Sequence, residues 1–149
     1  MIELQPMLPF IPLFLSMGET CDIDPCLLTS LAYFESKGDP DAVSKAGARG
    51  LFQFMEKTWA EWGEGDFDNA FDPEKATITA ARYLAWLTEQ MEGDVWLAVL
   101  AYGWGIGNVR KWLEGDRVLD DIPAQKFDYA NNVVRDMLDP QTSGIFISK

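Results

Sequence analysis

The sequence predicts a single, mainly α-helical domain. Apolar residues recur at helical spacing in several segments, and Asp-Pro pairs or glycine-rich breaks separate these segments. No segment alternates polar and apolar residues over any length, as half-buried strands would. A chain of 149 residues can bury most of its apolar surface in one core. We therefore expect one domain over 1–149, with an N-terminal arm at about 1–9 and a C-terminal tail at about 139–149.

Three helices are expected in the first half of the chain. The apolar run at 10–17 predicts the first of them. Asp24 is a suitable N-cap for the second, with Pro25 at the first helical position. Four apolar residues then share one helical face: Leu27, Leu28, Leu31 and Phe34. A third helix is predicted over 48–62, where Leu51, Met55 and Trp59 recur at helical spacing.

The second half of the chain alternates helical segments with short breaks. The pair Asp72-Pro73 predicts a helix start. The run VWLAVLAY is apolar on nearly every side, so we expect a short buried helix there, followed by a glycine-rich turn at 103–107. The predicted helices lie at 74–91, 95–102, 109–113 and 127–138. The final residues, GIFISK, are expected to form an edge strand or to extend away from the domain.

Histidine is absent from the chain, and only two cysteines are present. This composition excludes Ser-His-Asp and Cys-His nucleophilic sites and every zinc site built on histidine. Acid–base chemistry must therefore rest on Asp, Glu, Tyr or Lys, and we expect neither a metal nor another cofactor. The net charge of −12 argues against nucleic acid as a partner, because binding it requires clustered Lys and Arg.

Cys21 and Cys26 bracket the loop before the second predicted helix. A disulfide between them would fix the start of that helix and would indicate an oxidising compartment. Two small buried thiols fit the same positions. The sequence leaves both interpretations open.

Glu35 lies at the end of the apolar helical segment LLTSLAYFES, just before a turn-rich loop. Burial beside Leu31, Ala32 and Phe34 would disfavour the charged form of its carboxyl group, and so would the negative end of the helix dipole. Both effects raise the pKa, as a general acid working near neutral pH requires. By position alone, however, a glutamate at a helix end is more often a solvated surface residue.

Three motifs follow one another along the chain: ES at 35–36, SKAGARGLFQ at 44–53 and AYGWGIGNV at 101–109. Their combination resembles the soluble lytic transglycosylases, a family of the lysozyme-like superfamily that cuts bacterial peptidoglycan. The resemblance extends over roughly residues 12 to 138. It implies a helical lysozyme-like fold of the goose-type or transglycosylase kind, with an active-site cleft.

The resemblance also implies a mechanism. In that family, one glutamate protonates the oxygen of the bond between N-acetylmuramic acid and N-acetylglucosamine. The same group then takes the proton of the C6 hydroxyl, which closes a 1,6-anhydro ring without water, while the substrate's N-acetyl oxygen stabilises the transition state. By this resemblance Glu35 is the sole catalytic acid and base, whereas most glycosidases use two carboxylates.

The resemblance assigns substrate-binding roles to the second motif. Ser44 matches a serine that binds near the acid and the sugar's acetamido group, and Gln53 matches a glutamine that hydrogen-bonds substrate. Phe52 replaces the family's methionine, so one contact that faces substrate is expected to differ. Ser44 is also suited to a turn or cap before Gly47.

The third motif departs from the family pattern AYNAG. Tyr102 is retained, and its hydroxyl is expected to lie close to Glu35. Gly103 and Trp104 replace the family's Asn and Ala, and Trp104 is a candidate platform for stacking a sugar ring. Tyr129 matches the tyrosine that opens the family's last conserved helix and is a second candidate near the acid.

Glu56 and Glu61 are candidates for a second carboxylate. If either lay about 6.5–9.5 Å from Glu35 it would be placed to activate water, and the protein would be a hydrolysing muramidase. Glu56 stands where the family commonly has proline and follows Gln53 by three residues, so it could approach the groove. Beside Lys57, it is more commonly a surface residue.

The sequence therefore predicts an enzyme that cleaves peptidoglycan strands to anhydro-muramyl products. The alternatives are a hydrolysing muramidase on the same fold and a lysozyme-like module that only binds glycan or has a structural role. The expected partner is the glycan strand, with a larger envelope-spanning or virion assembly as a further option. The acidic protein is expected to be repelled by a cell wall that carries carboxylates, but salt screens this repulsion beyond about 8–10 Å.

The expected place of action is the bacterial cell wall or periplasm. The apolar segment 6–18 resembles part of a signal peptide, but no basic residue precedes it and three prolines interrupt it. It is also too short to cross a bilayer, so we expect no stable membrane insertion. The route to the wall stays open, with a phage-encoded protein and a secretion-apparatus component as alternatives.

Overall fold

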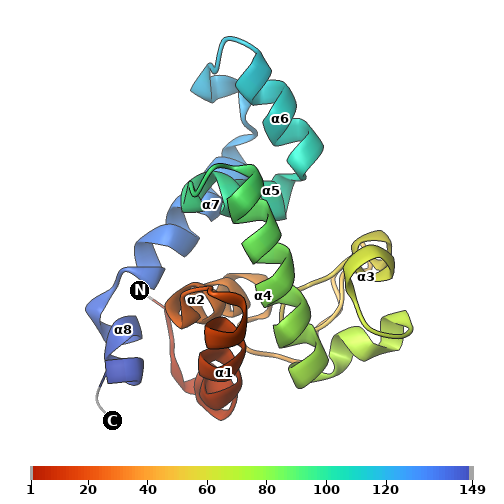
Figure 1. Cartoon of the computed structure of the whole chain (residues 1–149), viewed down its shortest axis with the longest axis vertical. Helices are drawn as coiled ribbons and strands as arrows, with labels where there is room; N and C mark the ends of the chain where they lie inside the picture. Colours follow the sequence, from red (N-terminus) through yellow and green to blue (C-terminus); the bar gives the residue numbers. More distant parts are fainter. Residues whose placement is uncertain (1, 148–149) are drawn as a thin grey trace.

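Helices and the loops that join them make up the computed structural model, which describes residues 2–147 (Figure 1). Eight α-helices lie in this part of the chain: α1 (Ile11–Cys21), α2 (Pro25–Ser36), α3 (Glu56–Trp62), α4 (Pro73–Gln90), α5 (Val95–Trp104), α6 (Ile106–Glu114), α7 (Ala124–Met137) and α8 (Pro140–Ile147). Three 3-10 helices accompany them: η1 (Gln5–Phe10), η2 (Phe67–Phe71) and η3 (Leu119–Asp121). The prediction of a mainly helical fold is confirmed.

Aspartate side chains begin several of these helices, among them α2, α4 and α5. Asp24, Asp72 and Asp94 each accept a hydrogen bond of 2.8–3.0 Å from a backbone N–H of the first turn. Such a bond satisfies one of the N–H groups that have no partner within the helix. The predicted starts of α2 and α4 are therefore confirmed.

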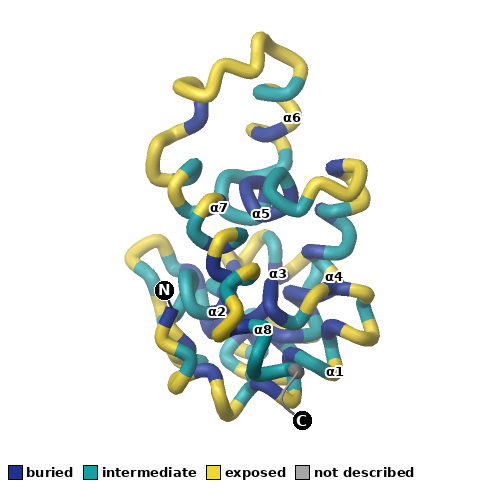
Figure 2. Tube along the Cα trace, turned by 90° about the vertical axis from the view of Figure 1, so that its left-hand side faces the viewer, coloured by how far each residue is buried: buried dark blue, intermediate teal, exposed yellow. Residues whose placement is uncertain are grey.

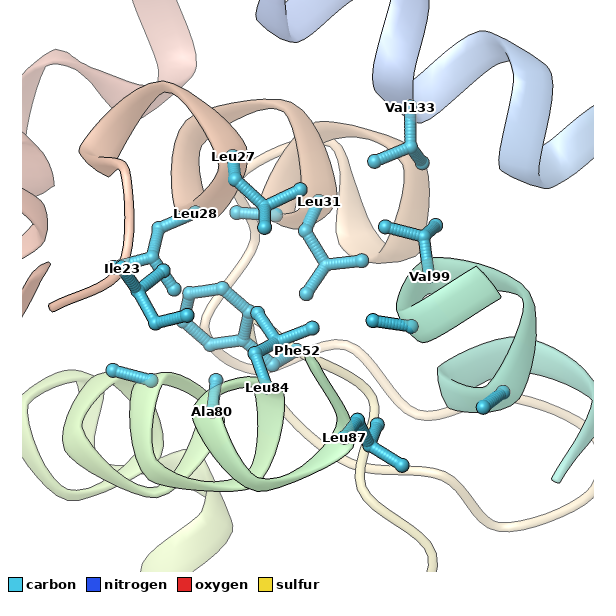
Figure 3. Close-up of a cluster of buried hydrophobic side chains, with 14 of the residues drawn as sticks. Ile23, Leu27, Leu28, Leu31, Phe52, Ala80, Leu84, Leu87, Val99 and Val133 are labelled. Carbon is cyan, nitrogen blue, oxygen red and sulfur yellow. The ribbon is translucent and has the colours of Figure 1, made fainter. Parts of the chain in front are cut away.

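The hydrophobic core lies between α2 and α4, and α5 and α7 close it from one end (Figure 3). Leu27, Leu28 and Leu31 of α2 face Leu84 of α4, and all four are at most 2% exposed. The ring of Phe52 lies between these two helices and comes from the loop that joins α2 to α3. Buried residues concentrate in this region, whereas the segment from α6 to the start of α7 is mostly exposed (Figure 2).

The predicted helix over 48–62 is wrong in its first half. Residues 43–54 form a tight loop held by isolated antiparallel bridges from Arg49 to Val43 and to Phe54, and helix α3 begins only at Glu56. The backbone φ is +83° at Gly50 and +52° at Gln53, values that a right-handed helix does not allow. The apolar residues of this segment recur at helical spacing, but residues 43–54 form a loop and not a helix.

Gly50 shows why this loop takes its shape. A Cβ atom at Gly50 would lie 2.0 Å from the carbonyl oxygen of Ala70, so the backbone here approaches η2 as only glycine permits. Trp59 of α3 faces inward as predicted and is 1% exposed. Met55, also predicted to face inward, precedes the helix and is 44% exposed.

Further differences concern the chain ends and two breaks. Residues 140–147 form α8, where an edge strand or an extended tail was expected, and the last two residues lie outside the described part. The glycine-rich turn is reduced to Gly105, because α5 continues through Trp104. Cys21 and Cys26 are free thiols, so the disulfide interpretation does not hold. Within residues 2–147, no helix has the length and hydropathy needed to cross a membrane.

Candidate active site

Glu35 lies in the last turn of α2 with its side chain half-buried. The hydroxyl of Tyr129 on α7 donates a hydrogen bond to Glu35 Oε2 over 2.5 Å. Burial raises the pKa of Glu35 to about 7, while the Tyr129 hydrogen bond and the nearby charge of Lys126 act in the lowering direction. A carboxyl group with this pKa can both give and accept a proton at neutral pH.

The end of α2 is fixed by the residue that follows it and by the 43–54 loop. Lys37 takes a left-handed conformation with φ +55°, and its N–H closes the last turn on Tyr33 O at 2.8 Å. Ser36 Oγ donates to Leu51 O over 2.9 Å, which ties the helix end to the 43–54 loop. The chain thus turns away at Lys37, and the Glu35 carboxyl group is directed at Tyr129 of α7.

Tyr102 of α5 lies close enough to the acid for the charge of Glu35 to act on it. Its hydroxyl donates to the carbonyl oxygen of Phe52 over 2.7 Å. Burial raises the pKa of Tyr102 well above its usual value, and the charges of Glu35 and Tyr83 add to this. The phenol therefore stays protonated close to Glu35, but its proton is directed to Phe52.

The side chain of Phe52 lies in the core. It is 0% exposed and meets the ring of Phe14 edge-on, with centroids 5.8 Å apart. The expectation that this side chain faces substrate is therefore wrong. Phe52 contributes its backbone carbonyl, which holds Tyr102.

Ser44 and Gln53 hold the loop that they belong to. Ser44 Oγ accepts a hydrogen bond from Ala48 N over 3.0 Å, as a turn or cap serine does. The Gln53 side-chain amide donates to Ala42 O at 3.2 Å and to Gly50 O at 3.0 Å. Both donors of the amide are thus used within the loop, and within the described residues its Oε1 atom makes no hydrogen bond.

A small cavity of about 60 Å³ lies beside Tyr102. It is lined by Gln53, Phe54, Met55, Thr58, Tyr83 and Tyr102. From here a run of aromatic rings continues: Tyr102 to Tyr83 (5.6 Å between centroids), Tyr83 to Trp62 (5.3 Å) and Trp62 to Trp86 (5.3 Å). We call these four residues the aromatic chain.

Trp62 and Tyr83 belong to the aromatic chain, although the sequence did not predict this role for them. Trp62 lies on α3 and Tyr83 on α4, so no spacing within one helix could have paired them. Glu61, also on α3, lies near Tyr83, because its charge adds to burial in raising the pKa of that tyrosine. The glutamate of α3 that approaches the aromatic chain is therefore Glu61.

The remaining predicted residues lie elsewhere. Glu56 begins α3 and is exposed. Trp104 ends α5 and lines a separate cavity of about 230 Å³ with Asn108 and Trp112 of α6. No three His, Cys, Asp or Glu residues between 2 and 147 gather in a way that could hold a metal ion.

Comparison with known proteins covers most of the chain. A family model described as "Transglycosylase SLT domain" matches residues 12–124. Membrane-bound lytic murein transglycosylase F of Pasteurella multocida is 35% identical over 94 residues, which are 59% of this chain and 18% of that protein. Membrane-bound lytic murein transglycosylase F 1 of Alkalilimnicola ehrlichii is 33% identical over 103 residues, or 65% and 20%. The chain thus spans about a fifth of the length of these relatives.

Solved structures of similar fold extend the comparison. The 70 kDa soluble lytic transglycosylase Slt70 from Escherichia coli is 26% identical, with a TM-score of 0.77 over 85% of this chain and 23% of that one. A complex of the 70 kDa soluble lytic transglycosylase with bulgecin A gives a TM-score of 0.84 over 97% of this chain and 25% of that one, at 22% identity, and shows the fold alone. On the family match over residues 12–124, the chain belongs to the transglycosylase SLT domain family.

Proposed function

We propose that this protein is a peptidoglycan lytic transglycosylase with Glu35 as its sole acid and base. The observation that carries the proposal is the half-buried carboxyl of Glu35, with a pKa of about 7 and a tyrosine hydroxyl on one of its oxygens, in a chain of the SLT family. Peptidoglycan is proposed as the substrate because the sequence relatives are named murein transglycosylases.

In the first proposed step, protonated Glu35 gives its proton to the oxygen that links N-acetylmuramic acid to N-acetylglucosamine. The bond from C1 to that oxygen breaks, and the N-acetylglucosamine end leaves with the proton. Because Tyr129 occupies Oε2, we assign the transferred proton to Oε1. The Tyr129 hydrogen bond then stabilises the carboxylate that remains.

In the second proposed step, the Glu35 carboxylate takes the proton of the C6 hydroxyl of N-acetylmuramic acid. The C6 oxygen bonds to C1, which closes the 1,6-anhydro ring, and Glu35 returns to its protonated form. No water is consumed. A pKa of about 7 suits both steps, because the group must be acid in one and base in the other.

We propose that sugar rings bind along the aromatic chain, which begins at Tyr102 beside the acid. Aromatic faces pack well against the apolar face of a pyranose. Gln53 Oε1 and Ser44 are proposed to contribute polar contacts from the 43–54 loop, and Trp104 is proposed as a more distant stacking surface. The proposed place of action is the bacterial cell wall, and a phage or secretion-associated assembly is a further hypothesis.

The test is mass spectrometry of the products that the purified protein releases from peptidoglycan. Anhydro-muramyl products from the wild type, none from Glu35→Gln and normal release by Glu56→Gln would support the proposal. Reducing-end products would mean that water is the acceptor, which is the hydrolysing muramidase alternative. Absence of any product from the folded wild type would contradict the enzyme assignment and favour the glycan-binding alternative.

A further inference from the structure

Gly103 of α5 lies directly against the ring of Tyr129. A Cβ atom at Gly103 would lie 2.8 Å from Cε2 and 3.0 Å from Cδ2 of that ring. Both distances are shorter than packed carbon atoms tolerate, since carbon contacts are optimal at about 3.5–4.0 Å. Any larger residue at 103 must therefore displace the ring.

The ring is held between two helices, because α5 and α7 pack closely against each other. Ala98 and Ala101 of α5 and Ala130 and Val133 of α7 are all 0% exposed. A well-packed core resists a shift of its helices. A displaced Tyr129 would therefore move relative to Glu35, to which its hydroxyl is bonded over 2.5 Å.

We propose that Gly103 is a positioning residue: its missing side chain leaves the space in which the Tyr129 ring reaches Glu35 Oε2. The pattern AYNAG, which the segment 101–105 resembles, has asparagine at this position. This chain has glycine there, and the missing side chain leaves space for the Tyr129 ring. Tyr129 also lies beyond the segment 12–124 that the family model matches. The inference rests on the proposed function only where it concerns catalytic rate.

The groups that face Glu35 come from two elements. Tyr129 and Lys126 belong to α7, and Tyr102 belongs to α5. The Tyr129 bond lowers the pKa of Glu35, and burial keeps Tyr129 itself protonated as a donor. Loss of this bond must therefore raise the pKa of Glu35.

The first experiment follows the carboxyl carbon of Glu35 by NMR titration in ¹³C-labelled protein. Gly103→Ala and Tyr129→Phe are each expected to move the midpoint upward by about one pH unit, since a hydrogen bond to a charged group is lost. The double variant should titrate like Tyr129→Phe alone. Gly107→Ala on α6 is the matched control, because a Cβ there meets nothing within 4 Å.

An unchanged midpoint in Gly103→Ala would overturn the proposal. So would a double variant whose midpoint lies above that of Tyr129→Phe by the full Gly103→Ala shift, because position 103 would then act without Tyr129. This readout needs no catalysis. If the wild type released no product from peptidoglycan, the proposed function would fail while the titration still tested the positioning.

A stability cycle keeps the proposal testable if Gly103→Ala folds poorly. Thermal midpoints are measured for the wild type, Gly103→Ala, Tyr129→Ala and the double variant. Gly103→Ala should lower the midpoint by several degrees in the wild type and leave it nearly unchanged in the Tyr129→Ala background, where the ring is gone. An equal loss in both backgrounds would mean that the clash involves something other than the ring, and the proposal would be wrong.

Discussion

Replacement of Glu35 by Gln is expected to stabilise the protein at high pH and to have little effect at low pH. Burial raises the pKa of Glu35 from 4.5 to about 7 in the folded state. The folded protein therefore holds this proton more tightly than the unfolded chain, and stability falls as pH rises from the unfolded pKa to the folded one. The loss amounts to about 3 kcal/mol, at 1.36 kcal/mol per pKa unit. A neutral glutamine avoids this loss.

The assay is urea denaturation of wild type and Glu35→Gln at about pH 5 and about pH 8.5. The lower value stays above the pI of 4.2, where the protein would tend to precipitate. About 2.5 kcal/mol of the total effect should develop between these two conditions, as a growing difference between variant and wild type. Taking the difference removes contributions from the other titrating groups.

Glu56→Gln is the matched control, because this glutamate is exposed at the start of α3. Its difference from the wild type should stay within about 0.5 kcal/mol at both pH values. A Glu35→Gln difference that is equally independent of pH would refute the reasoning, since the carboxyl would then be as well solvated in the folded protein as in the unfolded chain.

Three further substitutions test the surroundings of the site. Tyr102→Phe leaves the buried Phe52 carbonyl without its 2.7 Å partner and should cost about 1–3 kcal/mol in denaturant unfolding. Gly50→Ala places a Cβ 2.0 Å from Ala70 O at a φ of +83°, so the free energy of unfolding should fall by more than about 1 kcal/mol. Trp62→Ala removes one ring of the aromatic chain and should raise KM for glycan strands about 2–10-fold with little change in kcat.

The sequence predicts those parts of the fold that depend on local signals. Asp24 and Asp72 begin helices because their side chains bond the first turn, which depends only on neighbouring residues. The helix predicted over 48–62 was wrong in its first half, because Leu51, Met55 and Trp59 have helical spacing although residues 43–54 form a loop. The shape of this loop is determined by the close approach of Gly50 to Ala70, which is a tertiary contact that local sequence does not contain.

In the candidate active site, too, the features with a local sequence signal were predicted and those that depend on tertiary contacts were not. The position of Glu35 at the end of an apolar helix predicted a raised pKa, which the half-buried carboxyl has. The expected facing of Phe52 was wrong, because a loop between two helices can direct a large apolar residue into the core. The contact between the rings of Trp62 and Tyr83 is made between two helices, so no local sequence pattern could predict it.

A mechanism with one carboxyl group places a narrower demand on that group than a mechanism with two. Glu35 must release a proton and then recover one, so a pKa far from the working pH would slow one of the proposed steps. Burial alone raises the pKa, and the Tyr129 hydrogen bond opposes it, leaving a value of about 7. The balance depends on where the Tyr129 hydroxyl lies, which in this chain depends on the absence of a side chain at Gly103. A residue that touches no substrate can therefore set the pH range in which the acid works.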